Sequence, residues 1–411
     1  MVISKPGIAP DKDCRPTCSS AKNRNILITN MYGGLGGGEV AILSHIEYLV
    51  SKGKNVFLYL LEDGPFREAA VNAGASVIVS PLAWQGSKIR SLLHLFMKIA
   101  DFHTFLRKEN IYLTISYTFN DLVVAGLASA LNRRPIIYRA QGDVFKSFSE
   151  KPKTWLGPLV MPVIKMISPY IITTTKREHE ILEKWGFKKD RLAHVYLGTK
   201  QGNDQQSVSS SASLRDKYGW GDSVPVAGVF GRLIQWKGHE TVLRAIGRLK
   251  RENLKIGLWI IGSAEFGDGD AYVKSLEQII VQEDIADSVK FLGFREDTEA
   301  FMRACDIICH ASEFEPFGMV IIEAMMAARP VIASDVSGPR ESVINGVTGI
   351  LVQPGDVVAY TDALRHLVRS PEMRASMGKK AKERASKLFN QERNLARLYE
   401  ICESHVAGFS R

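Results

Sequence analysis

The stretch that decides the fold lies in the second half of the chain and reads Ser312-Glu313-Phe314-Glu315-Pro316-Phe317-Gly318-Met319-Val320-Ile321-Ile322-Glu323-Ala324. It follows an apolar run, 306–311, that is typical of a buried parallel strand. It then enters a helix near Gly318, which is expected to end before Pro330. A helix start directly after a strand favours anions, because its first backbone N–H groups have no partner inside the helix. The expected donors are the backbone N–H groups of Gly318, Met319 and Val320.

Two carboxylates flank this predicted anion site. Glu315 lies in the loop and Glu323 lies inside the helix. Carboxylates accept hydrogen bonds from hydroxyl groups and repel phosphate. A ligand with hydroxyls on both sides of a phosphate matches this profile, and a nucleotide sugar is such a ligand. The alternative is an acidic helix start that only complements the helix dipole.

The Glu-x7-Glu spacing, with Pro316-Phe317-Gly318 inside it, resembles the retaining glycosyltransferases of family four, which have the GT-B fold. The resemblance is specific over about residues 226–356 and weaker over 25–200. It implies an α/β protein with two Rossmann-like, doubly wound parallel-sheet domains and a cleft between them. It also implies that Glu315 holds the hydroxyls of the donor sugar and that Glu323 holds the ribose.

The length of 411 residues predicts about two domains. Residues 1–24 are polar and proline-containing, and are expected to form a disordered leader. Residues 25–198 are expected to form an N-terminal acceptor-binding domain, 199–224 a linker or mobile loop, and 225–390 a C-terminal nucleotide-sugar-binding domain. The resemblance implies that the last helix, about 391–411, crosses back to complete the first domain.

The composition is that of a soluble globular protein with a basic balance, 53 − 44 = +9. This charge suits an anionic ligand, an acidic membrane surface, nucleic acid or solubility alone. Because the chain contains no nucleic-acid-binding module, nucleic acid is not an expected partner. Five sparse cysteines predict a reducing compartment without a disulfide framework, and the absence of a signal sequence favours the cytoplasm. Cys305 and Cys309 beside His310 are expected to be packing residues rather than zinc ligands.

A glycine-rich turn opens the first domain. Residues 25–29 read as a strand, 40–52 as a helix, and the turn between them allows the backbone to approach a ligand closely. It matches neither the dinucleotide fingerprint nor the P-loop. The family resemblance implies that Gly34, Leu35, Gly36 and Gly37 lie near the donor diphosphate or the acceptor.

Residues 84–110 predict an amphipathic helix whose basic residues include Lys98, Arg107 and Lys108. One interpretation is a surface helix that packs on the sheet and turns a solvated basic face outward. The other is peripheral docking on anionic lipid at the inner face of a membrane.

Gln141 follows the predicted strand 135–139 and stands where members of the family usually carry a histidine that contacts the donor sugar. Glutamine can donate and accept a hydrogen bond, but it does not titrate near neutral pH, so a histidine base is excluded here. Asp143 is the nearest carboxylate that could orient an acceptor hydroxyl. The alternative for Asp143 is a cap at the start of a loop.

Two cations follow the first strand of the second domain, 226–230. Arg232 and Lys237 lie between Gly231 and Gly238, before a helix over 240–251. A departing diphosphate gains negative charge, which such a clamp would stabilise. The resemblance implies this role for both side chains. The alternative is surface solubility.

The remaining donor-site residues come from neighbouring loops. The turn after the strand 289–292 is where the resemblance places the nucleobase. Asp268-Gly269-Asp270 is interpreted as a helix start and not as a metal ligand set, so no metal and no cofactor are expected. The predicted donor site comprises Gly34, Leu35, Gly36, Gly37, Gln141, Gly231, Arg232, Lys237, Gly262, Phe294, Arg295, Glu315, Phe317, Gly318, Met319, Val320 and Glu323.

Together these patterns predict a hexosyltransferase that moves a sugar from a nucleoside diphosphate donor, UDP or GDP, to an acceptor hydroxyl with retained configuration. Arg232, Lys237, Glu315 and Asp143 are the predicted catalytic residues. The acceptor could be a glycan, a lipid-linked molecule or a small molecule, as in polysaccharide or glycolipid biosynthesis. The alternatives are a nucleotide-sugar epimerase or hydrolase on the same fold, or a noncatalytic nucleotide-sugar-binding subunit.

Overall fold

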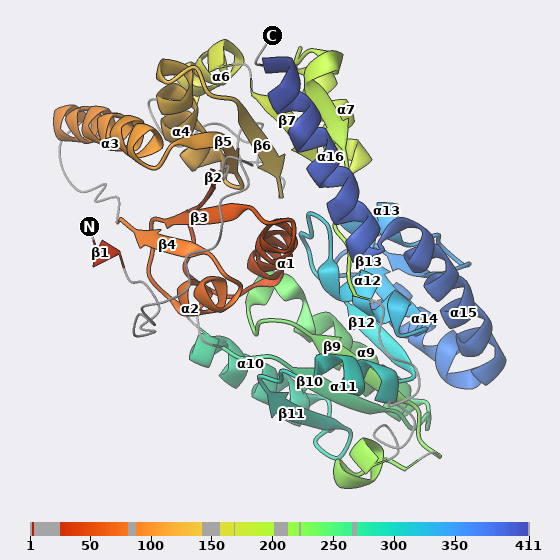
Figure 1. The fold of residues 1–411 in the computed structure, drawn as a ribbon. Helices are drawn as coiled ribbons and strands as arrows, with labels where there is room; N and C mark the ends of the chain where they lie inside the picture. Colours follow the sequence, from red (N-terminus) through yellow and green to blue (C-terminus); the bar gives the residue numbers. More distant parts are fainter. Residues whose placement is uncertain are drawn as a thin grey trace, which may run out of the picture. The chain divides into compact units, whose positions relative to one another are not determined.

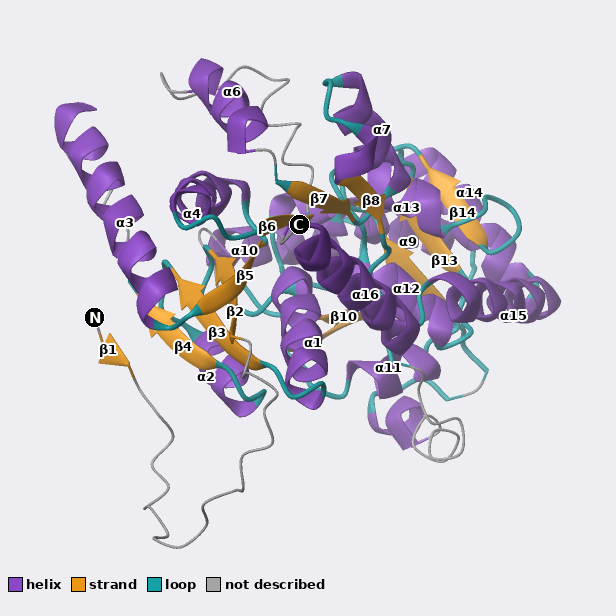
Figure 2. Ribbon diagram, turned by 45° about the horizontal axis from the view of Figure 1, so that its top comes forward, coloured by secondary structure: helices purple, strands orange, loops and turns teal. Residues whose placement is uncertain are grey.

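The chain divides into two compact α/β units. The computed structural model describes residues 2–3, 25–80, 88–141, 157–167, 169–200, 213–221, 223–264 and 269–409. Unit 1 comprises Met1–Tyr196 and Leu395–Arg411, and unit 2 comprises Leu197–Asn394. In each unit helices surround a sheet (Figures 1 and 2). Most of the predicted leader and half of the predicted linker lie outside the described residues.

Unit 1 has a sheet of order β1-β4-β3-β2-β5-β6-β7-β8, in which only β1 pairs antiparallel to its neighbour. Its strands are β1 (Val2–Ile3), β2 (Asn25–Asn30), β3 (Asn55–Leu60), β4 (Ser76–Val79), β5 (Ile111–Ser116), β6 (Ile136–Ala140), β7 (Tyr170–Thr173) and β8 (Leu192–His194). Its helices are α1 (Gly37–Ser51), α2 (Pro65–Asn72), α3 (Lys88–Lys108), α4 (Phe119–Leu131), α6 (Gly157–Ile167), α7 (Lys176–Lys184), the short η1 (Lys189–Arg191) and α16 (Gln391–Phe409).

Unit 2 has an all-parallel sheet of order β11-β10-β9-β12-β13-β14. Its strands are β9 (Val226–Phe230), β10 (Gly257–Ile261), β11 (Val289–Gly293), β12 (Ile307–His310), β13 (Val331–Ser334) and β14 (Gly349–Val352). Its helices are η3 (Gln235–Lys237), α9 (His239–Arg251), α10 (Gly269–Gln282), α11 (Thr298–Ala304), α12 (Met319–Met326), α13 (Ser337–Ser342), α14 (Val357–Arg369) and α15 (Pro371–Leu388). The strand order reverses at β9, which lies between β10 and β12. Ligands of doubly wound sheets bind at such a switch point, outside the carboxyl ends of the strands.

The strands are apolar on both faces because helices cover both sides of each sheet. In β2, Leu27 packs into one core cluster while its neighbours Ile26 and Ile28 pack into the other. Successive side chains of a strand point to opposite faces, so a continuous apolar run satisfies two cores at once. The last helix, α16, contributes Leu398, Cys402 and Val406 to the second cluster. The predicted α/β fold with two parallel sheets is confirmed.

One predicted feature of helix α3 is wrong. Lys98, expected on a solvated basic face, is buried and donates a hydrogen bond from Nζ to Ser80 Oγ over 2.6 Å. Burial lowers the pKa of Lys98 despite the nearby charge of Asp101. The packing face of the helix carries Phe102 and Leu106, whereas Phe96 is 62% exposed. Among the described helices none is both long and apolar enough to cross a membrane.

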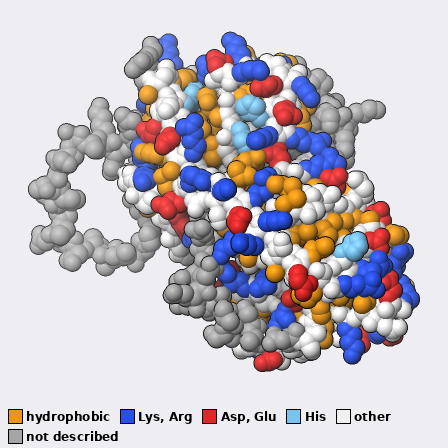
Figure 3. Space-filling model, turned by 90° about the vertical axis from the view of Figure 1, so that its right-hand side faces the viewer, with side chains coloured by type: hydrophobic (Ala, Val, Ile, Leu, Met, Phe, Trp, Pro, Cys, Tyr) orange, Lys and Arg blue, Asp and Glu red, His pale blue; other side chains and the backbone are white. Residues whose placement is uncertain are grey.

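The cysteines that the structure describes belong to the cores. Cys305 and Cys309 are buried in unit 2, as the packing interpretation predicted, and Cys402 is buried in unit 1. Cys14 and Cys18 lie outside the described residues. On the face drawn in Figure 3, Lys and Arg side chains are scattered among apolar and acidic ones.

Candidate functional site

Loops from neighbouring strands of unit 2 meet at the carboxyl edge of its sheet. The loop after β9 bonds to the loop after β10 through Leu233 N–H and the Ser263 carbonyl, 2.9 Å apart. It also bonds to the loop after β12, because Glu313 N–H donates to the Trp236 carbonyl over 2.8 Å. The loop after β12 in turn bonds to α13, because the Gly338 N–H donates to the Glu315 carbonyl over 3.0 Å. The segments that carry most of the predicted donor-site residues of unit 2 therefore form one continuous surface beside the topological switch point.

At the centre of this surface, Lys237 and His310 both bind the carboxylate of Glu315. Lys237 Nζ lies 2.7 Å from Glu315 Oε2, and His310 Nε2 lies 3.0 Å from the same oxygen. Since a carboxylate only accepts, the His310 Nε2–H donates. Both donors bind Oε2, and among the described residues no donor binds Oε1. We call Lys237, His310 and Glu315 the edge cluster.

The electrostatics of the edge cluster keep Glu315 ionised. Burial would raise the pKa of its carboxyl, but the hydrogen bond from His310 and the charges of His310 and Lys237 outweigh burial and lower the pKa to about 2. Glu315 is therefore a fixed acceptor at neutral pH and cannot serve as a proton donor. Its Oε1 is suited to accept a hydrogen bond from a ligand hydroxyl.

Gly238 sets the position of Lys237. It ends η3 and begins α9 with a φ of 71°, a left-handed conformation that favours glycine. A Cβ at this position would lie 2.1 Å from the carbonyl oxygen of Ala311, in the loop after β12. The two loops can approach this closely only because Gly238 has no side chain.

We expect Gly238→Ala to destabilise the protein by about 3 kcal/mol, from the left-handed φ and the clash with Ala311 together. Gly355→Ala is the matched control, because Gly355 has a φ of 75° and nothing within 4 Å of its would-be Cβ. That control should cost only about 1 kcal/mol. Urea unfolding measures both values. Equal destabilisation by the two variants would contradict the close loop packing.

The start of α12, which was predicted as an anion site, lies at Met319, next to the predicted helix start near Gly318. Gly318 is the N-cap, with a φ of 90°. Among the described residues no acceptor binds the backbone N–H groups of Gly318, Met319 or Val320. Glu323, one turn into the helix, is part-buried and its carboxyl has no hydrogen-bond donor among the described residues. Burial, and to a smaller extent the charge of Glu299, raises its pKa to about 7.

The raised pKa of Glu323 predicts a pH-dependent cost of folding. The carboxyl of the unfolded chain loses this proton near its ordinary pKa of 4.5 and that of the folded protein near 7, so the favourable contribution present below pH 4.5 is lost as the pH rises toward 7. We expect Glu323→Gln to gain roughly 2–3 kcal/mol relative to the wild type between pH 4.5 and pH 8. Urea unfolding at both values measures the gain, with the exposed Glu277→Gln as control. A wild-type-to-variant difference independent of pH would disprove this assignment.

Other predicted residues of unit 2 take different positions. Arg232 follows β9 and has an exposed side chain, and Gly231 and Gly262 are in close contact, since a Cβ on Gly262 would lie 1.8 Å from the Gly231 carbonyl oxygen. Phe294 is 65% exposed in the turn after β11. Arg295 forms two hydrogen bonds with Asp297, both of 2.9 Å.

Phe317, which is part of the predicted donor site, has its side chain in the core of unit 2. Phe317 is buried at 4% exposure and its ring packs edge-on against Phe389, with 5.8 Å between the ring centroids. An apolar side chain beside a helix start fills the core more readily than it contacts a polar ligand. Phe317 therefore anchors the loop that carries Glu315.

In unit 1, Gln141 faces the glycine-rich turn. Its Oε1 lies 3.5 Å from where a Cβ of Gly38 would be. Gly34, Leu35 and Gly36 occupy the link from β2 to α1, and Gly37 is the first residue of α1. The Gly36 N–H donates to Glu39 Oε2 over 3.0 Å, and Leu35 is 41% exposed. Asp143 lies outside the described residues.

Two histidines were not predicted as part of the site. His310 had been considered only with its neighbouring cysteines, and the signal that could have identified it is its place at the end of β12, five residues before Glu315. His239 is buried beside the cluster, and its ring nitrogens have no hydrogen-bond partner among the described residues. Burial lowers the pKa of His239 to about 4, assisted by Lys237 and His310. The ring is therefore neutral at pH 7.

The chain has two α/β units with largely parallel sheets, and the edge cluster lies at the strand ends of unit 2. This is the fold of the GT-B class of proteins. The model of Glycosyltransferase Family 4 matches residues 35–200, and that of Glycosyl transferases group 1 matches residues 210–384. The two matches together span most of the chain, which belongs to the family-four type of glycosyltransferases.

Individual relatives agree with this assignment. Anabaena HepE, crystallised with UDP and glucose and also with UDP-glucose, is 25% identical and covers 92% of this chain and 99% of its own, with a TM-score of 0.78 for the first complex. The D-inositol 3-phosphate glycosyltransferase of Corynebacterium glutamicum is 26% identical over 92% of this chain and 93% of its own length. The alpha-D-kanosaminyltransferase of Streptomyces kanamyceticus is 28% identical, over 57% of this chain and 61% of its own length. Against this last relative the chain thus spans about three fifths of the curated protein.

Proposed function

We propose that this protein transfers a sugar from a nucleoside diphosphate sugar to an acceptor hydroxyl with retention of anomeric configuration. The observation that carries the proposal is the edge cluster, in which Lys237 and Glu315 come from loops on the two sides of the switch point. The cation suits a diphosphate, and the unoccupied Oε1 of the ionised carboxylate suits a sugar hydroxyl. The UDP and UDP-glucose complexes of Anabaena HepE support the choice of donor class.

In the proposed reaction the bond between the anomeric carbon and the β-phosphate oxygen breaks, and a bond from that carbon to the acceptor oxygen forms. The leaving diphosphate gains negative charge, which Lys237, Arg232 and the N–H groups at the start of α12 stabilise. Glu315 orients the sugar and Glu323 accepts hydrogen bonds from the ribose. A phosphate oxygen of the leaving group takes the acceptor proton on the same face of the sugar, so no protein nucleophile is required. These cations also make a metal ion unnecessary in this proposal.

The proposal extends to a hexosyl donor linked to UDP or GDP, and to an acceptor that is a glycan, a lipid-linked molecule or a small molecule. Asp143 would orient the acceptor hydroxyl, and Gln141 would contact the donor sugar in place of the usual histidine. We place the protein in the cytoplasm, where α3 could dock at the inner face of a membrane. The exposed Phe96 and Met97 on this helix support peripheral contact.

A thermal-shift screen of UDP-, GDP- and ADP-sugars tests the donor class. A donor at a hundred times its Kd stabilises the folded state by about 2.7 kcal/mol. We expect one nucleotide series to raise the unfolding temperature by several degrees in the wild type and much less in Lys237→Met. No shift with any nucleotide sugar would contradict the proposal. Rapid conversion of the bound donor without an acceptor would instead indicate an epimerase or hydrolase.

A further inference from the structure

Unit 1 contains a cavity of about 1140 Å³ at the end of its sheet opposite the glycine-rich turn. Tyr112, near the start of β5, and Pro135, just before β6, line it, together with residues of α4, α6 and α16. The glycine-rich turn and Gln141 lie at the carboxyl ends of these parallel strands. The length of β5 therefore separates the cavity from that edge by roughly 20 Å. The cavity is no part of the site described above.

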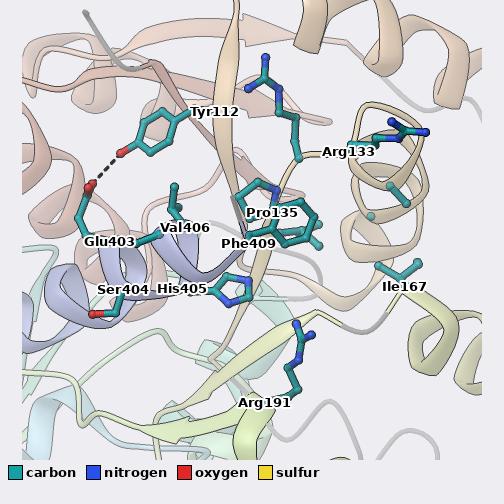
Figure 4. Close-up of a pocket in the computed structure, with 15 residues that line it drawn as sticks. Tyr112, Arg133, Pro135, Ile167, Arg191, Glu403, Ser404, His405, Val406 and Phe409 are labelled. Carbon is teal, nitrogen blue, oxygen red and sulfur yellow. Dashed lines mark hydrogen bonds between the residues drawn. The ribbon is translucent and has the colours of Figure 1, made fainter. Parts of the chain in front are cut away.

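The lining of the cavity carries an excess of positive charge. Three arginines line it, namely Arg133, Arg134 and Arg191. The acid of the lining, Glu403, is already engaged, since it binds Lys54 Nζ at 3.0 Å and accepts from the Tyr112 hydroxyl at 2.8 Å (Figure 4). Within the described part of the chain, neither Arg133 nor Arg191 has an acidic partner.

One wall of the cavity is aromatic. His405 lies between Tyr170 and Phe409, with ring centroids 4.9 Å and 6.3 Å away. In Figure 4 Arg191 points into the space beside His405, and Phe409 and Ile167 lie around the same space. Phe409 is 46% exposed, and the residues next to the lining include the exposed Met166 and Leu131. Partly or fully exposed arginines therefore lie beside apolar side chains at this cavity.

We propose that this cavity binds a phosphate group carried on an apolar body. The guanidinium fork of arginine matches the geometry of phosphate oxygens and forms charge-assisted hydrogen bonds with them. The rings of Phe409 and Tyr112 and the side chain of Ile167 would cover the apolar part of the ligand. Two sources supply this chemistry, a water-soluble phosphate ester and the headgroup of an anionic phospholipid. The site would act independently of the proposed donor site.

The test uses phenyl phosphate as the soluble probe and vesicles of phosphatidate in phosphatidylcholine as the lipid probe. Calorimetry measures phenyl phosphate binding, and flotation measures vesicle binding. We expect the double variant Arg133→Gln/Arg191→Gln to weaken binding about tenfold or more for whichever of the two probes the wild type binds. The charge-matched control is Lys380→Gln/Arg397→Gln, which removes two cations from outside the cavity lining and should bind as the wild type does. Thermal unfolding checks that both double variants are folded.

The two arms identify the source of the ligand. Variant-sensitive binding of phenyl phosphate, with changes in the ring signals of His405 in NMR spectra, would support a soluble ester. Variant-sensitive binding of phosphatidate vesicles alone would support a lipid headgroup. If neither probe binds, or if the cavity variant and the control bind both probes equally well, the cavity is not a phosphate site and the proposal fails.

Discussion

Replacement of Lys237 by Met is expected to lower the rate of sugar transfer by about a hundredfold to a thousandfold, the usual effect of removing one donor that stabilises developing negative charge. Lys237 Nζ lies at the carboxyl edge of the sheet, 2.7 Å from Glu315, and its side chain is only 17% exposed. A cation so placed stabilises a leaving diphosphate more strongly than one in water would. Affinity for the nucleotide should fall as well, because the cation also contacts the ground-state diphosphate.

The same variant should unfold more easily. It leaves the part-buried carboxylate of Glu315 with His310 as its remaining partner in the edge cluster, which we expect to cost about 1–3 kcal/mol. Lys237→Arg keeps the charge and should retain part of the activity. Lys250→Met, in the same unit, removes a partly exposed lysine that pairs with Asp284 and Asp287, and should leave turnover unchanged. Full turnover by Lys237→Met would eliminate the proposed role of this cation.

Glu315→Gln is expected to reduce transfer by about a thousandfold while the affinity for the free nucleoside diphosphate stays within a few-fold of the wild type. Glutamine preserves the shape of the side chain but removes the charge that Oε1 offers to a sugar hydroxyl. The nucleotide would still bind through Lys237 and the start of α12. Steady-state kinetics and calorimetry with the nucleoside diphosphate distinguish the two variants. Lys237→Met should lower both the rate of transfer and the affinity for the nucleotide, whereas Glu315→Gln should lower the rate alone.

The stability of Glu315→Gln gives a second readout. The folded pKa of Glu315, about 2, lies below the ordinary glutamate pKa of 4.5, so its contribution to stability is present above pH 4.5 and is lost as the pH falls toward 2. The difference in unfolding free energy between wild type and variant should therefore shrink in that window. Glu313→Gln is the control, since Glu313 is exposed in the same loop. It should match the wild type in activity and in pH dependence, and equal losses in both variants would refute a specific role for Glu315.

Sequence reasoning predicted the local elements of the site well, because strand and helix starts have local signals. The apolar run ending at His310 and the glycine before Met319 are examples. The contact between Lys237 and Glu315 spans 78 positions in the chain and depends on β9 and β12 being neighbours in the sheet. No local pattern contains this strand order, and it became predictable only through the resemblance to a known family.

The differences between the predicted and the observed positions of side chains originate in tertiary packing. Lys98 was expected in solvent because charged residues on amphipathic helices usually are, but the Ser80 hydroxyl provides a buried partner. Phe317 was grouped with the donor residues by its place in the motif, whereas its ring fills the core against Phe389, more than seventy positions away. The role of His310 was missed because its acceptor lies on a loop whose course the sequence does not specify.

The most direct test of the central claim is a crystal structure of the wild type with the nucleotide sugar that gives the largest thermal shift. The claim is that the edge cluster and the start of α12 hold the donor. The expected result is density for the diphosphate within hydrogen-bonding distance of Lys237 Nζ and of the Gly318 and Met319 N–H groups, with a sugar hydroxyl on Glu315 Oε1. Density for the donor elsewhere in the protein, with the Lys237–Glu315 contact unchanged and no ligand beside it, would contradict the account.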